Sequence, residues 1–417
     1  MTSLPLDGIT VLDLSRLLPG PLCSQHLADL GADVIKIEDP GLGDYARWSG
    51  KPQTVNSPFF LAMNRNKRSV ALDLKTTKGV DLLKNLVADA DVLLESFRPG
   101  VMARLGCDYD TLAAINPRLV YCSVTGYGQT GPNRHLGGHD INFIAEAGIS
   151  DQTGAADGPP ILSNFQIADL AGGALSAAMG ILAALYDASR NGKGRHVDVS
   201  MADCAMVHSL FPLVAKTRTG QAAARGADRL TGATPAYGYY RTADNRHLAV
   251  AALERQFWQR LCEQVIDRPD LVNPSSEQAD QLHAILTDIF AGKSLAEWQR
   301  RLAGIDCCVN AVLTPDEAMD SPQAQSRGLI IRASHPVEGE VLQYSFPIKM
   351  TDYQFSIRRP APMLGEHTAE VLGLSPDEAA LLATAGVTAP LKKGSSAPLE
   401  KGSSAPLEKG SSAPLEK

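Results

Sequence analysis

The chain has 417 residues, of which 44% are hydrophobic and 20% are charged, a balance typical of a folded globular protein. This length can bury a sizeable core and favours two lobes over one small domain. The 46 acidic and 39 basic residues give a formal net charge of −7. That charge disfavours general nucleic-acid binding, because phosphate backbones are held by clustered lysine and arginine.

The N-terminal segment MTSLPLDGITVLDLS has no basic stretch followed by an apolar run, and no run approaches the roughly 20 apolar residues of a membrane span. The seven cysteines are scattered and form no CxxC pair, so we interpret them as reduced thiols. We therefore expect a cytoplasmic protein that has no contact with a membrane.

Short β-rich runs alternate with helical patterns in the first third of the chain. The β-rich runs are ITVLDLS, DVIKIE, SVALDLK, DVLLESF and LVYCSVTGYG, and the helical patterns include SQHLADLG and KGVDLLKNLVADA. Strands separated by crossover helices predict an α/β fold with a parallel, doubly wound sheet.

Changes in composition divide the rest of the chain. A polar, Gly/Ala-rich stretch and a new β pattern begin near residue 219, and a further change follows Ser321. We predict a large Rossmann-like domain built from both ends of the chain, residues 1–218 and 322–391, with a smaller α/β domain, 219–321, inserted between them. Residues 392–417 contain three copies of KGSSAPLE and are interpreted as an artificial tag.

Three residues are candidates for acid/base chemistry. His139 in GGHDINF lies at a predicted strand-to-helix junction, where open α/β sheets bind ligands, although a lone His is also common in structural roles. Asp169 in QIADLAGG is an acid in an apolar, small-residue helix, and is either functional or placed there by the helix dipole. Glu254 ends HLAVAALE at a predicted strand-to-helix turn, where an ordinary helix-start carboxylate is the favoured interpretation from the residues alone. Asp140 is the expected N-cap of the helix after His139.

Several strings in the same order resemble the CaiB/BaiF type III CoA-transferase family. They are LDGITVLDLSRLLPGP, LADLGADVIKIEDPGLGD, SVALDLK, ESFRPGVMARLG, GYGQTGP, GKGRHVDVSMAD and PAPMLGEHTAEVL. Within this family, GHDINF resembles the segment that supplies a catalytic His to racemases, and ALERQFW resembles the one that supplies a Glu. The aspartate of ADLAGG is catalytic in both the racemases and the transferases.

The resemblance implies a racemase that inverts the α-carbon of a 2-methylacyl-CoA through an enolate. His139 and Asp169 would be the two bases, because inversion needs proton removal on one face and delivery on the other. Glu254 would orient His139, and the Asp140 amide would stabilise the enolate oxygen. The resemblance implies an acyl-CoA substrate, and no metal or cofactor beyond the CoA moiety.

The resemblance also implies the contacts to coenzyme A. They are Leu72, Lys75, Ser96, Phe97, Arg98, Arg104, Gly138 and Asp140. Solvated surface charge is the other interpretation of the basic residues. Asp39 departs from the family, whose racemases often carry a basic residue there.

Family members form interlocked homodimers, so we expect an obligate dimer in which Glu254 can act in its own subunit or in the partner. The alternative function is a type III CoA-transferase with Asp169 as covalent nucleophile. His139 argues against it, and TGATPAYGYYRTAD lacks the glycine-rich cluster found in transferases. A non-catalytic acyl-CoA-binding protein is a third reading, disfavoured because all three acid/base residues are present.

Overall fold

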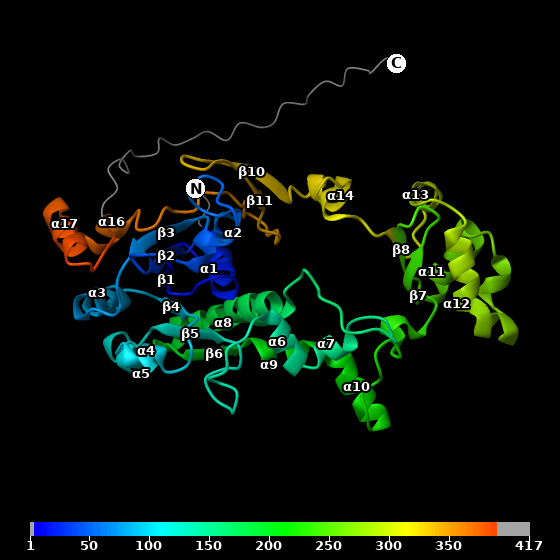
Figure 1. The fold of residues 1–417 in the computed structure, drawn as a ribbon, viewed down its shortest axis with the longest axis horizontal. Coiled ribbons are helices and arrows are strands. Elements are labelled where there is room, and N and C mark those ends of the chain that lie inside the picture. The colour runs from blue at the N-terminus through cyan, green and yellow to red at the C-terminus, as the bar shows by residue number, and fades with distance from the viewer. Residues whose placement is uncertain (1–3, 390–417) are drawn as a thin grey trace, which may run out of the picture.

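The computed structural model describes residues 4–389, and a six-stranded sheet organises the N-terminal half of the chain (Figure 1). The strands are β1 (Thr10–Asp13), β2 (Asp33–Glu38), β3 (Lys67–Ala71), β4 (Val92–Glu95), β5 (Val120–Thr125) and β6 (His196–Ser200). Their order is β3-β2-β1-β4-β5-β6, and every pairing is parallel. This confirms the predicted α/β fold with a parallel sheet. The edge strand β6 was not among the predicted strands.

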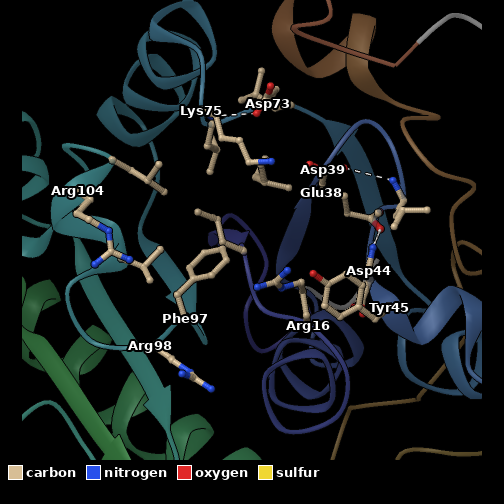
Figure 2. Close-up of a pocket in the computed structure, with 18 of the residues that line it drawn as sticks. Arg16, Glu38, Asp39, Asp44, Tyr45, Asp73, Lys75, Phe97, Arg98 and Arg104 are labelled. Atoms are coloured by element: carbon tan, nitrogen blue, oxygen red, sulfur yellow. Dashed lines mark hydrogen bonds between the residues drawn. The ribbon is translucent and has the colours of Figure 1, made fainter. Parts of the chain in front are cut away.

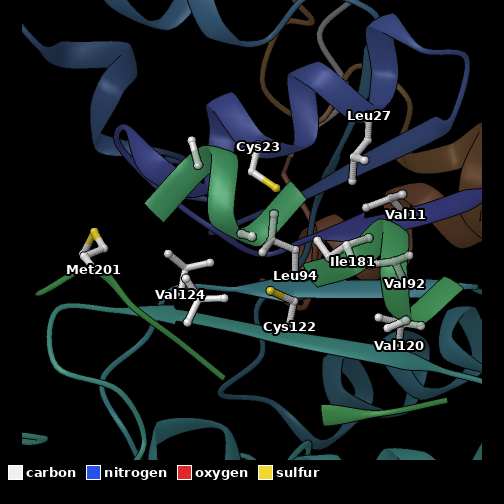
Figure 3. Packing of buried hydrophobic residues seen from close by; sticks show 14 of the residues in the cluster. Val11, Cys23, Leu27, Val92, Leu94, Val120, Cys122, Val124, Ile181 and Met201 are labelled. Atoms are coloured by element: carbon white, nitrogen blue, oxygen red, sulfur yellow. The ribbon is translucent and has the colours of Figure 1, made fainter. Parts of the chain in front are cut away.

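Two hydrophobic cores cover the two faces of this sheet. Successive strand residues point to opposite faces, so Val11 enters one core and Leu12 the other. The first core packs under α1 (Pro19–Asp29), α8 (Ser176–Asn191) and α9 (Met201–His208), and Figure 3 shows part of it. The second packs under α3 (Thr77–Ala88) and α5 (Tyr109–Ile115). The sheet is therefore doubly wound.

The small-residue helix of the sequence begins as a π-helical segment, η2 (Ala168–Leu175), and continues as α8. A Cβ on Gly172 would lie 2.6 Å from the Met201 carbonyl oxygen, and one on Gly173 would lie 2.8 Å from Pro19. These glycines therefore allow close packing of η2 against α9 and α1.

The helix Ala168–Asn191 is long and apolar enough to span a membrane by length and composition, contrary to the expectation that no such run exists. Half of its apolar window is buried inside the protein, where Ala177 and Ile181 belong to the first core. A buried core helix meets the same criteria. The absence of membrane contact stays a prediction.

Residues 237–311 form a second sheet with a core of its own. Strands β7 (Tyr237–Arg241), β8 (His247–Ala251) and β9 (Val309–Ala311) are antiparallel. Their core includes residues from α12 (Ser276–Ala291) and α13 (Leu295–Leu302), and Figure 1 shows this part apart from the parallel sheet. Its status as an inserted domain of residues 219–321 stays a prediction.

The C-terminal part of the described chain packs beside the N-terminal strands. The hairpin β10 (Ile330–His335) and β11 (Gly339–Tyr344) precedes α16 (Thr368–Leu372) and α17 (Pro376–Thr384). The Ala71 amide donates to Thr368 Oγ1 at 3.1 Å, and the Asp73 amide donates to the Val387 carbonyl at 2.9 Å. The predicted tag, 392–417, lies outside the described residues.

The other elements are short, apart from α10. They are η1 (Tyr45–Trp48), α2 (Pro58–Met63), α4 (Val101–Arg104), α6 (Asp140–Glu146), α7 (Ile149–Gln152), α10 (Leu210–Thr219), η3 (Arg229–Ala233), α11 (Arg255–Arg260), η4 (Leu261–Val265), η5 (Pro269–Val272), α14 (Pro315–Met319) and α15 (Pro322–Ser326).

Candidate active site

His139 lies at the start of α6, after the loop that leaves the carboxyl end of β5. It is the N-cap of the helix, with φ −124° and ψ 174°, and its amide donates to Asn142 Oδ1 at 3.0 Å. A Cβ on Gly138 would lie 2.7 Å from the Phe143 ring, so this position requires glycine for the loop to approach the helix. His139 itself is exposed. The imidazole is therefore accessible to a ligand.

Asp140 is the first residue of α6 and not its N-cap as expected. Its side chain is buried, and Oδ1 accepts a hydrogen bond from the Asp169 amide at 3.0 Å. The carboxylate therefore joins α6 to the first turn of η2 instead of capping its own helix. Asp169 is the second residue of that π-helical segment, a rare geometry that occurs frequently at functional sites.

The electrostatics of Asp169 are those of an acid/base group. Burial and the nearby charge of Asp140 together raise its pKa to about 6, against the opposing effect of His139. The structure thus brings His139, Asp140 and Asp169 together. A carboxyl whose pKa lies near neutral pH can both give and take a proton during a reaction.

Glu254 is not part of this group within one chain. It is the exposed N-cap of α11, after β8 in the second sheet. The charges that act on Asp169 are those of Asp140 and His139, whereas Glu254 acts on the Cys308 thiol, whose pKa burial, Asp306 and Glu254 raise. The three predicted catalytic residues therefore do not assemble from a single described chain.

A cavity of about 800 Å³ lies at the carboxyl ends of the strands (Figure 2). Five of the predicted CoA contacts line it, namely Leu72, Lys75, Phe97, Arg98 and Arg104. Ser96 is beside the cavity, where its Oγ accepts a hydrogen bond from the Arg16 amide at 3.1 Å. Gly138 and Asp140 are at the start of α6 instead. The cavity combines cations with apolar surface, as a nucleotide with phosphates requires.

Arg16 is a cavity residue that sequence reasoning missed. Its guanidinium lies 4.8 Å from the Tyr45 ring centroid and 5.0 Å from that of Phe97, so it sits between two aromatic side chains. Its place directly after β1, at the carboxyl end of a parallel strand, was the signal that could have found it. Asp39 also lines the cavity, and its Oδ1 accepts from the Gly41 amide at 2.9 Å.

A cluster of buried charged side chains lies next to the cavity. Lys36 Nζ lies 2.8 Å from Asp44 Oδ2 and donates to the Ser15 carbonyl at 2.9 Å. Asp44 Oδ1 accepts from the Leu17 amide at 2.9 Å. The two lysines Lys36 and Lys67 and two serine hydroxyls hold the pKa of Asp13 well below its usual range against the effect of burial. The cluster fixes the backbone on both sides of Arg16.

Comparison with known proteins identifies the family. The family described as CoA-transferase family III matches residues 6–368. Human alpha-methylacyl-CoA racemase is 36% identical over 370 residues, 88% of this chain and 92% of the relative. Acetyl-CoA:oxalate CoA-transferase of Acetobacter aceti is also 36% identical, over 375 residues, 88% and 94% of the two chains. Mouse succinyl-CoA:glutarate CoA-transferase is 33% identical over 377 residues, which cover 88% of this chain and 86% of the relative.

Solved structures agree with this result. A CaiB/BaiF family protein from Brucella suis has a TM-score of 0.78 at 30% identity, covering 89% of this chain and 99% of that one. A protein from Mycobacterium tuberculosis has a TM-score of 0.76 at 32% identity, covering 88% and 99%. The chain belongs to CoA-transferase family III, the CaiB/BaiF family, which confirms the resemblance. It is an enzyme of the family III CoA-transferase and racemase group, and both activities occur among similarly distant relatives.

The contact between Asp140 and Asp169 makes a testable prediction. Asp140→Asn keeps an oxygen that can accept from the Asp169 amide but removes the neighbouring negative charge. We expect the pKa of Asp169 to fall from about 6 by roughly one pH unit, measured by NMR titration of labelled carboxyl carbons. The exposed Asp157→Asn variant is the control. An unchanged titration of Asp169 in Asp140→Asn would show that the charge of Asp140 does not act on it.

Proposed function

We propose that this enzyme is a 2-methylacyl-CoA racemase that inverts the α-carbon by two-base proton transfer. The observation that carries the proposal is the juxtaposition of the His139 imidazole and the Asp169 carboxyl at the starts of two neighbouring helices. A racemase needs two acid/base groups around one carbon. A transferase needs only the carboxylate.

The reaction proceeds through an enolate. One of His139 and Asp169 removes the α-proton, and the C–H electron pair moves into the thioester carbonyl. The other group, protonated beforehand, delivers its proton to the opposite face of the α-carbon. The two groups have then exchanged protonation states, and proton exchange with water restores them. Each contributes roughly 10² to 10⁴ in rate by general acid–base catalysis.

The enolate oxygen requires fixed hydrogen-bond donors. The first amides of a helix have no partner within it, and the helix dipole favours negative charge at that end. Asp140 is the first residue of α6. Its amide is therefore the donor that we assign to the enolate oxygen, at low reorganisation cost because the helix already holds it in place.

Coenzyme A occupies the cavity in this proposal. Arg98, Arg104 and Lys75 supply positive charge for its phosphates, while Leu72 and Phe97 supply apolar surface for the purine. The reaction uses no cofactor beyond the CoA moiety of the substrate. We place the enzyme in the cytoplasm, acting without nucleic acid or a membrane.

A homodimer completes the site in this proposal. Large apolar side chains remain exposed along α8 and α10, including Met179 at 67% and Phe211 at 55% exposure. Exposed apolar surface of this kind is typical of a protein interface. An interlocked partner covers it and brings its own Glu254 to the imidazole of His139, which Glu254 then orients.

The alternative is a CoA-transferase. Relatives with that activity are as similar to this chain as the racemase, and the partly buried Asp169 carboxyl is a suitable nucleophile. In that reaction the Asp169 carboxylate attacks the acyl-CoA carbonyl, and the CoA thiolate leaves to give a mixed anhydride. His139 has no required role in those steps.

Variants of the two bases distinguish the mechanisms. In His139→Ala, Asp169 can still exchange one α-proton but cannot complete inversion, so we expect epimerisation to fall by at least about 10²-fold while exchange from one enantiomer survives. Asp169→Ala should show the mirror-image pattern. Chiral chromatography and mass spectrometry in deuterated water measure the two processes. Both variants should retain wild-type circular dichroism.

Hydroxylamine supplies the opposing outcome. It traps aspartyl anhydrides and thioesters, so it should leave the wild-type racemase active during turnover. Inactivation that requires an acyl-CoA and disappears in Asp169→Ala, together with an almost unaffected His139→Ala enzyme, would establish the transferase.

Mixed dimers test the role of Glu254. We expect His139→Ala and Glu254→Gln homodimers each to be impaired. In a hybrid of the two chains, one site combines intact His139 with Glu254 of the other chain, so about half of the wild-type activity per dimer should return. Co-expression with two different tags isolates the hybrid. A hybrid as inactive as its parents would place Glu254 in its own subunit's site, and a fully active Glu254→Gln homodimer would remove its proposed role.

A further inference from the structure

Glu95 is a buried acid that the proposed reaction does not use. It is the last residue of β4 and is only 4% exposed. Its Oε2 accepts a hydrogen bond from the Phe97 amide at 2.7 Å, and Ser123, its register partner on β5, places a hydroxyl near its carboxyl. The carboxyl therefore holds the backbone of the segment after β4, which forms one wall of the cavity.

The segment that Glu95 holds touches both sides of the cavity. Phe97 lines the cavity and packs against the Arg16 guanidinium, at 5.0 Å from its ring centroid. Ser96 Oγ accepts from the Arg16 amide at 3.1 Å. The bond between Glu95 and Phe97 therefore supports the position of the aromatic ring and of the arginine next to it.

Ser123, opposite Glu95 in the sheet, leads from the carboxyl to the edge of the sheet. Ser123 Oγ lies 3.0 Å from His196 Nε2, on the edge strand β6. The His196 ring stacks on Tyr109 at 5.4 Å between centroids. When the ring N–H donates to Ser123, the single hydroxyl proton points to Glu95. Protons can thus reach the carboxyl from the edge of the sheet without passing through the cavity.

The charges around this path allow Glu95 to titrate near neutral pH. Burial and the charge of Asp198 on β6 together raise its pKa to about 7, against the Ser123 hydroxyl and the Phe97 amide, which lower it. Burial lowers the pKa of His196, against the charges of Asp198 and of Asp110 on α5.

The neighbouring residues on β5 stay neutral. Burial raises the pKa values of Tyr121 and Cys122 well above their usual range. On the side of β1, the guanidinium that faces Phe97 is that of Arg16.

We propose that Glu95 is a positioning residue for the CoA cavity, and that its protonation through the path from His196 and Ser123 weakens acyl-CoA binding as the pH falls below neutrality. The proposal rests on the proposed function, because it requires CoA in the cavity. Above neutrality the ionised carboxylate holds the Phe97 amide by a charge-assisted hydrogen bond. Protonation places the proton on the carboxyl and leaves a neutral bond of roughly half the strength.

Calorimetric titration with free coenzyme A, from pH 6 to 8.5, tests this proposal. The wild-type dissociation constant should rise by up to about tenfold between pH 8 and pH 6, since one proton is linked to the loss of binding. Glu95→Gln should bind more weakly at pH 8 and lack this component of the pH dependence. Its KM should rise with little change in kcat, because the contact serves binding and not proton transfer.

Three further variants separate Glu95 from other titrating groups. Glu277→Gln, on the exposed side of α12, is the matched control and should behave as wild type. His135→Gln, in the cavity wall, should keep the pH-dependent change in coenzyme A affinity that we assign to Glu95. Ser123→Ala removes a bond that lowers the pKa of Glu95, so the midpoint of the affinity change should move to higher pH. This shift tests the proposal even if Glu95→Gln fails to fold.

Three results would overturn the proposal. Full wild-type pH dependence in Glu95→Gln, or an unmoved midpoint in Ser123→Ala, would remove the role of Glu95 and leave the proposed function intact. A wild-type protein that does not bind coenzyme A at any pH would overturn both this proposal and the assignment of the cavity.

Discussion

The hydrogen bond from the Asp169 amide to the Asp140 carboxylate is the interaction on which the candidate active site depends. It joins residues 29 positions apart and ties the start of α6 to the first turn of η2. Because His139 precedes Asp140 directly, this one contact places the imidazole near the Asp169 carboxyl. It also has an electrostatic effect, since burial and the charge of Asp140 raise the pKa of the Asp169 carboxyl.

The parallel sheet supplies the second constraint. Loops after parallel strands meet at one edge, where Arg16, Phe97 and Lys75 come from different loops to one cavity. The buried lysines and aspartates beneath it fix the loop after β1. Burying such ion pairs costs desolvation free energy. We therefore infer that they fix the geometry of this loop more than they stabilise the fold. Glu95 performs a similar task behind the loop after β4.

Much of the fold could be predicted from the sequence, because hydrophobic strands and helices alternate clearly up to β5. The strand β6 was missed because it is a short edge strand with alternating polar residues. The π-helical turn at Asp169 has no signal in composition, since packing of Gly172 and Gly173 against neighbouring elements determines it. The family resemblance identified His139 and Asp169 as candidates. The hydrogen bond through Asp140 that brings them together could be seen only in the folded structure. Arg16 and Glu95 were missed because their roles depend on neighbours distant in sequence.

In the proposed reaction, the pair His139 and Asp169 inverts a carbon and does not transfer coenzyme A. The most direct test is incubation of the wild-type enzyme with one enantiomer of a 2-methylacyl-CoA in deuterated water. We expect formation of the other enantiomer with one deuterium at the α-carbon. Retention of configuration without deuterium, together with movement of coenzyme A to an added carboxylic acid, would contradict it.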